Sequence, residues 1–142
     1  MGDAQDSPET GRVLGLDFGT KRTGVAMSDP TRTVVQPHDA VLKANSSDGI
    51  ASIAALVASF EVTRIVVGLP MGLQGAESPQ AARSRSFAAR LAQHVSVPIE
   101  LHDERFTSRM ADRTVAETGS GASRDSLAAS HLLQSWMEAQ DA

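Results

Sequence analysis

The 142-residue sequence predicts a single α/β domain built on a mixed sheet, with three antiparallel N-terminal strands followed by parallel strands and with helices on both faces. Three observations favour this fold class. Short apolar runs separated by turn residues come first along the chain. Helical patterns then alternate with two further apolar runs, as in strands joined by crossover helices. The chain length suits one compact domain.

Three consecutive strands are expected at the start of the domain. The run from Val13 to Phe18 is apolar and contains an aspartate just before a turn glycine, as in a buried central strand. Residues 23–28 are expected to pair antiparallel with it across a turn. After a second turn at Asp29-Pro30, residues 33–35 are expected to form a short third strand.

Helices and strands alternate in the rest of the predicted fold. The N-cap residues at 45–48 precede apolar residues at helical spacing. A right-handed crossover through this helix would set the next strand parallel to the first. The other expected elements are a strand at 63–67, a helix beginning at Ser78-Pro79, a strand at 97–102, and helices over 107–117 and 123–140.

The two ends of the chain are acidic, and the body between them is close to neutral. Five acids lie within residues 1–10 and 138–142, so that without them the formal charge of −4 becomes +1. Residues 1–10 also lack apolar periodicity, and we expect a disordered acidic tail ahead of one domain over residues 11–140. A near-neutral body with clustered arginines can bind a phosphate backbone locally, although it lacks the strongly basic footprint of a non-specific binder.

Acidic side chains are expected to gather at one edge of the sheet. Asp17 ends the first strand, and Asp103 and Glu104 end the last one. The carboxyl ends of parallel strands meet at the edge where open α/β sheets bind ligands. Asp125 begins the buried stripe of the final helix. Strand alternation alone does not decide whether Asp103 or Glu104 faces Asp17.

A cluster of carboxylates without cysteine or histidine is typical of a site for Mg²⁺ or Mn²⁺. Two such ions can activate a water and stabilise the leaving oxygen of a phosphodiester, so the pattern predicts a metal-dependent nuclease. Each acid also has a structural interpretation. Asp17 precedes a turn glycine, and Asp125 lies in a first helical turn, where the helix dipole favours an acid.

Arginines accompany the acids along the chain. A role in surface ion pairs is about as well supported as substrate binding for any single one of them. Those that could position a phosphate backbone are Arg83, Arg85, Arg105 and Arg109.

Composition excludes several function classes. The chain has no cysteine, which excludes disulfides, zinc–thiolate sites and thiol catalysis. No apolar run is long enough to span a membrane, and the N-terminus lacks the apolar stretch of a signal peptide. We therefore expect a cytoplasmic protein that does not associate with membranes.

Four motifs resemble the YqgF family, which is also called RuvX. They are Leu14–Ala26, Val67–Pro70, His102–Thr107 and Asp125–Ala129, and they follow the family's order over residues 12–137. The resemblance implies an RNase H-like fold in a bacterial cytoplasmic protein. Members of the family are described as nucleases for 5′-end maturation of pre-16S rRNA and also as Holliday junction resolvases.

The resemblance also implies which residues form the site. It places the catalytic and metal-binding carboxylates at Asp17, Glu104 and Asp125, and so favours Glu104 over Asp103. The residues implied to contact the substrate or position the site are Thr20, Lys21, Arg22, Arg105 and Thr107. Arg83, from the arginines above, completes the expected nucleic-acid-binding set.

The leading hypothesis is a nuclease acting on structured RNA, such as pre-rRNA in ribosomal particles, as a monomer or weak homodimer. A resolvase of four-way DNA would apply the same chemistry to branched DNA and would need a two-fold dimer to place two cuts. A non-catalytic nucleic-acid-binding module is a further alternative. Nucleotide binding of the sugar-kinase kind, suggested by Asp17–Thr20, would need two such domains, for which the chain is too short.

Overall fold

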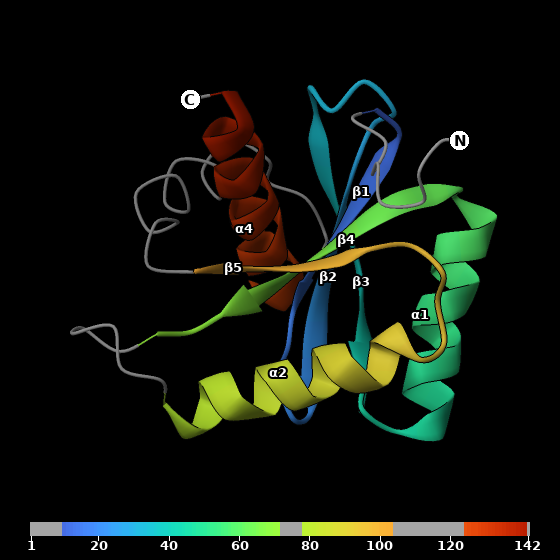
Figure 1. The fold of residues 1–142 in the computed structure, drawn as a ribbon, viewed down its shortest axis with the longest axis vertical. Helices are drawn as coiled ribbons and strands as arrows, with labels where there is room; N and C mark the ends of the chain where they lie inside the picture. Colours follow the sequence, from blue (N-terminus) through green and yellow to red (C-terminus); the bar gives the residue numbers. More distant parts are fainter. Residues whose placement is uncertain (1–9, 72–77, 104–123, 142) are drawn as a thin grey trace.

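The computed structural model describes residues 10–71, 78–103 and 124–141. Within them, five strands form one mixed sheet (Figure 1). The strands are β1 (Arg12–Asp17), β2 (Arg22–Ser28), β3 (Val35–Leu42), β4 (Val62–Leu69) and β5 (Ile99–Asp103). Their order across the sheet is β3-β2-β1-β4-β5, with β2 antiparallel to β1 and β3, and with β4 and β5 continuing the sheet parallel to β1. The carboxyl ends of β1, β3, β4 and β5 therefore lie at the same edge.

Helices cover both faces of this sheet. α1 (Ser47–Ser59) and α2 (Pro79–Ala92) pack on one face, and α4 (Arg124–Asp141) crosses the other (Figure 1). The mixed sheet between two helical layers confirms the predicted fold class. The helix expected over 107–117, and the tail expected at 1–10 apart from Thr10, lie outside the described residues. Among the helices that the structure describes, none is long and apolar enough to cross a membrane.

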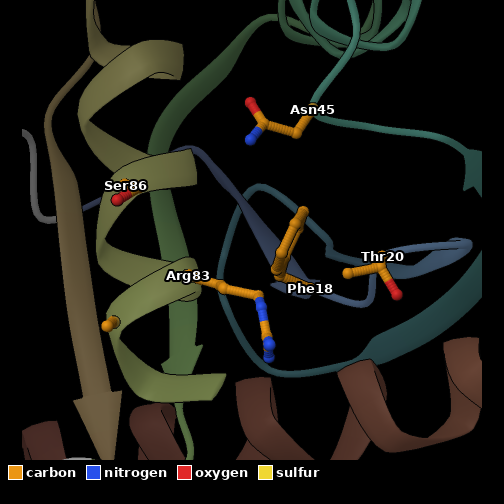
Figure 2. A pocket seen from close by; sticks show the side chains of 6 residues that line it. Phe18, Thr20, Asn45, Arg83 and Ser86 are labelled. Atoms are coloured by element: carbon orange, nitrogen blue, oxygen red, sulfur yellow. The ribbon is translucent and has the colours of Figure 1, made fainter. Parts of the chain in front are cut away.

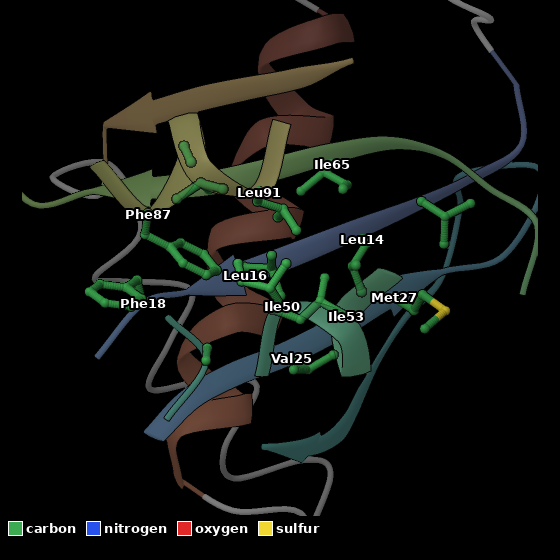
Figure 3. Close-up of a cluster of buried hydrophobic side chains, with 14 residues drawn as sticks. Leu14, Leu16, Phe18, Val25, Met27, Ile50, Ile53, Ile65, Phe87 and Leu91 are labelled. Atoms are coloured by element: carbon green, nitrogen blue, oxygen red, sulfur yellow. The ribbon is translucent and has the colours of Figure 1, made fainter. Parts of the chain in front are cut away.

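The main core lies between the sheet and the helices α1 and α2 (Figure 3). Leu16 of β1, Ile53 of α1 and Leu91 of α2 are fully buried in it. Phe18 stacks on Phe87 with ring centroids 4.5 Å apart, which joins the end of β1 to α2. Burial of these large side chains is the main favourable contribution to folding.

A second, smaller core lies between the sheet and α4. Val13 and Val66 from the sheet pack there with Leu133 and Trp136 of α4. Val13 thus lies on the face opposite Leu16, as strand alternation along β1 predicts. The apolar side chains of β1 therefore divide between the two cores.

The third strand is longer and later than the sequence predicts. We expected a short strand at 33–35, whereas β3 begins at Val35 and runs for 8 residues. The reason is Asp29, whose Oδ1 accepts hydrogen bonds of 2.7 Å from the backbone N–H groups of both Thr33 and Val34. Those donors are used inside the turn and cannot enter the sheet. The Thr31 hydroxyl and the Val34 N–H, which donate to this carboxylate, hold the pKa of Asp29 well below its usual range.

Serine caps set the starts of α1 and α2, as predicted. Ser46 Oγ accepts a hydrogen bond of 3.0 Å from the Gly49 N–H, and Ser78 Oγ accepts one of 3.1 Å from the Ala81 N–H. Proline follows Ser78 in the first helical turn, where its missing N–H costs nothing. The Ser78 hydroxyl also donates to the carbonyl of Pro70, so the start of α2 is held at the end of β4.

Candidate active site

Asp17 is the last residue of the central strand and lies at the edge where the parallel strands end. It pairs with Gly24 of β2 and is half-buried. Pleat alternation puts Asp17 on the same face as Val13 and Gly15, which both pack against α4. Asp17 therefore lies on the α4 side of this edge.

Gly15 allows α4 to lie close to β1. A Cβ at Gly15 would be 3.2 Å from Leu133 Cβ and 3.3 Å from the carbonyl oxygen of Ala129, which is closer than ordinary contacts. The space beside Gly15 is filled by α4, so the glycine positions a helix rather than leaving room for a ligand.

Ser126 holds the start of α4 against the sheet. Its Oγ accepts a buried hydrogen bond of 3.2 Å from the Val25 N–H, at the point where the register between β2 and β3 shifts. The carbonyl of Ser126 in turn accepts a bond of 3.1 Å from Ser130 Oγ. Because Val25 is adjacent to Gly24, the partner of Asp17, the bond from the Val25 N–H places the first turn of α4 near Asp17. Asp125 precedes Ser126 in that turn, and its side chain lies outside the described residues.

The faces of β5 can be assigned from its contacts. Leu101 packs against the main core, whereas His102 Nε2 lies 3.0 Å from Ser135 Oγ of α4. Asp103 is still paired in the sheet, opposite Leu69, so alternation places it on the main-core side, away from the face of Asp17. Glu104, which we expected to complete the carboxylate set, lies outside the described residues.

His102 is held on the α4 face as a structural residue. Burial lowers its pKa, although the charges of Glu100 and Asp103 act in the opposite direction, so the neutral ring is favoured. Its contact with Ser135 occupies one ring nitrogen. This arrangement gives His102 a structural contact and leaves oxygen atoms as the metal ligands expected at the nearby edge.

The turn after Asp17 presents exposed polar and basic side chains. Thr20, Lys21 and Arg22 are all exposed at this edge. A Cβ at Gly19 would clash with the carbonyl oxygen of Arg22, so the turn depends on a glycine there. The other two residues of the expected binding set, Arg105 and Thr107, lie outside the described residues.

A metal site is not assembled by the described residues alone, which contain no group of three or more side chains that could hold an ion. Two of the three expected carboxylates, those of Glu104 and Asp125, lie outside that part of the structure. The carboxylate of Asp17 is a hard oxygen donor of the kind that Mg²⁺ and Mn²⁺ prefer. The metal ligand set therefore stays a prediction.

A pocket of about 310 Å³ opens on the other side of the same edge. We call it the α2 pocket; its lining residues are Phe18, Thr20, Asn45, Ala82, Arg83 and Ser86 (Figure 2). The binding set predicted from the sequence includes Thr20 and Arg83 but not Asn45 or Ser86. The latter two are far apart in the chain; Asn45 is one of several N-cap residues before α1 and Ser86 has the setting of an ordinary helix residue, so no pattern singles them out.

Comparison with known proteins adds independent information. A family model described as RuvX, Holliday junction resolvase, matches residues 11–139. A protein of Myxococcus xanthus that carries the name pre-16S rRNA nuclease is 39% identical over 133 residues, which cover 90% of this chain and 88% of the relative. An Anaplasma marginale protein of the same name is 42% identical over 108 residues, covering 76% of this chain and 69% of that one.

Solved structures agree on the fold. RuvC of T. thermophilus, in complex with a Holliday junction substrate, superposes with a TM-score of 0.60 at 12% identity over 92% of this chain and 95% of RuvC. The resolvase of fowlpox virus gives a TM-score of 0.56 at 14% identity, covering 91% of this chain and 98% of the resolvase. The likeness shows that the chain has the RNase H-like fold of these resolvases. With the family model and the relatives that match along most of its length, the chain belongs to the RuvX family of nucleases.

Proposed function

We propose that this nuclease hydrolyses phosphodiester bonds in the 5′-end maturation of pre-16S rRNA during ribosome biogenesis. The observation that carries the proposal is the position of Asp17, which ends the central strand on the face where Ser126 holds the first turn of α4. Relatives that cover most of the chain carry the name of such a nuclease. Ribosomal RNA is processed in the bacterial cytoplasm, where we expect the protein to act.

We propose that Asp17, Glu104 and Asp125 hold the divalent ions, either Mg²⁺ or Mn²⁺. When bound, such ions supply activation of a water and charge stabilisation at the leaving oxygen of the phosphodiester. The fold itself would hold the elements that carry Asp17 and Asp125 in fixed positions. Asp17 belongs to a strand paired on both sides, and the bond from Val25 to Ser126 holds the helix that carries Asp125.

Basic residues around Asp17 would hold the substrate backbone. Lys21 and Arg22 follow Asp17 in an exposed turn, and Arg83 projects from α2 on the other side of the edge. We propose the same role for Thr20, Arg105 and Thr107. Because contacts of this kind go to phosphates rather than to base edges, they would set the position of the RNA without reading its sequence.

A Holliday junction resolvase is the second candidate, because the matching family model carries that description. The chemistry would be the same, but two symmetric cuts need two sites related by a two-fold axis. For RNA processing we propose a monomer or a weak homodimer that acts on pre-rRNA or ribosomal particles. A stable two-fold dimer would favour branched DNA as the substrate.

A cleavage assay with Mg²⁺ or Mn²⁺ tests the proposal. Wild type, Asp17→Asn and the control Asp39→Asn, which removes an exposed acid from β3, would each be given an rRNA 5′ precursor fragment and a four-way DNA junction. Asparagine keeps the size of aspartate but removes its charge. We expect Asp17→Asn to lose at least about 100-fold in RNA cleavage, since even residues that only support metal ligands cost roughly 10- to 100-fold. Asp39→Asn should cleave like wild type.

The possible results separate the candidates. Cleavage of the DNA junction alone, lost in Asp17→Asn, would select the resolvase. Equal cleavage by wild type and Asp17→Asn would contradict the carboxylate mechanism and point to a contaminating nuclease. Binding of RNA without cleavage by any of the proteins would select a non-catalytic binding module.

A further inference from the structure

The α2 pocket lies next to Asp17 but on the face opposite α4. Phe18 follows Asp17 directly, and its ring forms one wall of the pocket while its other contacts join it to Phe87 (Figure 2). The volume of about 310 Å³ is at the lower end of small-molecule sites, which span roughly 300–1,000 Å³. The pocket therefore suits one nucleotide and is too small for a duplex.

Asn45 is held in place at the rim of this pocket. Its backbone carbonyl and its side-chain Oδ1 both accept hydrogen bonds from Arg90 Nη1 of α2. With the oxygen occupied in this way, the amide NH₂ group is the part of Asn45 that can donate to a ligand. Ser86, one turn before Arg90 on the same helix, adds a hydroxyl that can donate or accept.

Arg83 brings a positive charge to the same pocket. It extends from α2 past Phe18, and its Nη1 donates a bond of 3.1 Å to Gln80 Oε1 (Figure 2). No carboxylate pairs with Arg83 in the part of the chain that the structure describes. A site for one unpaired nucleotide needs a contact for the phosphate, a surface for the base and hydrogen-bonding groups for the edge of the base. In the α2 pocket Arg83 can contact the phosphate and Phe18 offers the apolar surface. Asn45 and Ser86 supply the hydrogen-bonding groups.

We propose that the α2 pocket binds a single unpaired nucleotide of the RNA strand that is cleaved at the Asp17 edge. The base packs against Phe18 and is hydrogen-bonded by Asn45 and Ser86, and its phosphate contacts Arg83. The proposal rests on the proposed function, and it adds that the substrate must offer a single-stranded nucleotide beside the cut. A continuous duplex cannot fill the pocket.

Binding without divalent ions tests the pocket separately from cleavage. A fluorescently labelled single-stranded RNA and a duplex RNA of the same length would be titrated with wild type, Ser86→Phe and Ala92→Phe. Ser86 lines the pocket, so a phenylalanine there would take up part of its volume, whereas Ala92 is an exposed residue at the end of α2 that does not line it. We expect Ser86→Phe to weaken binding of the single strand about 10-fold, as for the loss of one stacked base. Ala92→Phe should bind like wild type, and neither variant should change duplex binding.

Two further measurements strengthen the test. Asn45→Ala should weaken binding of the single strand about fivefold, as for the loss of one hydrogen bond. A scan of abasic nucleotides along the RNA should find one position that weakens wild type but has no added effect on Ser86→Phe. Thermal unfolding of each variant checks that the fold is kept.

The outcomes are distinct from those of the nuclease assay. If Ser86→Phe loses single-strand binding while wild type cleaves nothing, the pocket is supported and the nuclease proposal fails. If wild type cleaves RNA and Ser86→Phe binds and cleaves it equally well, the pocket proposal is overturned and the nuclease stands. An equal loss in Ser86→Phe and Ala92→Phe, or a changed oligomeric state in Ser86→Phe alone, would also overturn it.

Discussion

The two faces of the sheet are built from different kinds of residue. The face under α1 and α2 is covered by large apolar side chains, including Leu16, Ile53 and Phe87. The face under α4 has a smaller apolar core, and α4 buries more polar side chains than α2, of which Ser84 is the buried polar residue. The buried polar side chains of α4 are Ser126, Ser130, His131 and Ser135.

The two faces contribute differently to the stability of the fold and to the positioning of the site. Large apolar side chains gain free energy when buried but accept many similar arrangements. Buried hydroxyl groups contribute less, but they have directional bonds that favour one placement of α4, as the bond from Val25 to Ser126 does. The α4 face is also the face of Asp17. We infer that the main core supplies most of the stability and that the α4 face sets the geometry of the site.

The largest effect on stability is expected in the main core. Ile53→Ala should lower the free energy of unfolding by about 2–5 kcal/mol, because Ile53 is fully buried and a cavity would remain. The smaller change Ile53→Val should lower the free energy of unfolding by only about 0.5–1.5 kcal/mol. Chemical denaturation measures both. Cleavage per folded molecule should stay at the wild-type level, and a loss of cleavage in the folded Ile53→Val protein would argue against the division between the faces.

A change on the α4 face should lower cleavage per folded molecule more than it lowers stability. Gly15→Val places branches where even a Cβ would be 3.2 Å from Leu133 Cβ, so α4 must move away from β1. We expect a cost of about 1–3 kcal/mol in unfolding free energy, as for overpacked cores. RNA cleavage by the protein that remains folded should fall much further than the folded fraction does.

Gly15→Ala is the matched control for this change, because it adds only the Cβ. The neighbours of the added Cβ must shift by a few tenths of an ångström. Gly15→Ala should therefore lie between wild type and Gly15→Val in both stability and cleavage. If Gly15→Val kept full cleavage per folded molecule, close packing of α4 would not be what positions the site.

Much of the fold could be predicted from the sequence, because its signals are local. The apolar run of β1, the caps at Ser46 and Ser78 and the stripe of α4 are each visible within a few residues. β3 was expected too early, because the turn around Asp29 extends to Val34, and too short, because the strand contains a proline. Pro37 is tolerated there, at the edge of the sheet, although proline usually argues against a strand.

The site was predictable only in part. Asp17 could be placed from strand alternation and from the resemblance to a known family. Whether Asp103 shares its face depended on how far β5 stays regular, which the sequence does not show and the pairing with Leu69 does. Ser126 gave no signal, since serine in a helix is usually exposed and its acceptor role depends on a strand 101 residues away in the chain.

A smaller effect on stability than that of Ile53→Ala is expected from the hydroxyl that anchors α4. Ser126→Ala leaves the buried Val25 N–H without its side-chain acceptor, which should cost about 1–2 kcal/mol in unfolding free energy. Ser130→Ala is the matched control. Its hydroxyl bonds back to the carbonyl of Ser126 within the same helix, so its loss should have little effect.

The decisive measurement for Ser126 is the ratio of cleavage to stability. If the α4 face sets the geometry, Ser126→Ala should lose more cleavage per folded molecule than Ile53→Val, even where denaturation gives the two variants the same stability. Metal titration of the cleavage rate should also shift to higher Mg²⁺ concentration, because the helix that carries Asp125 is held less firmly. Equal cleavage per folded molecule in Ser126→Ala and Ile53→Val would mean that both faces contribute in the same way, and that the hydroxyl groups of α4 are structural only.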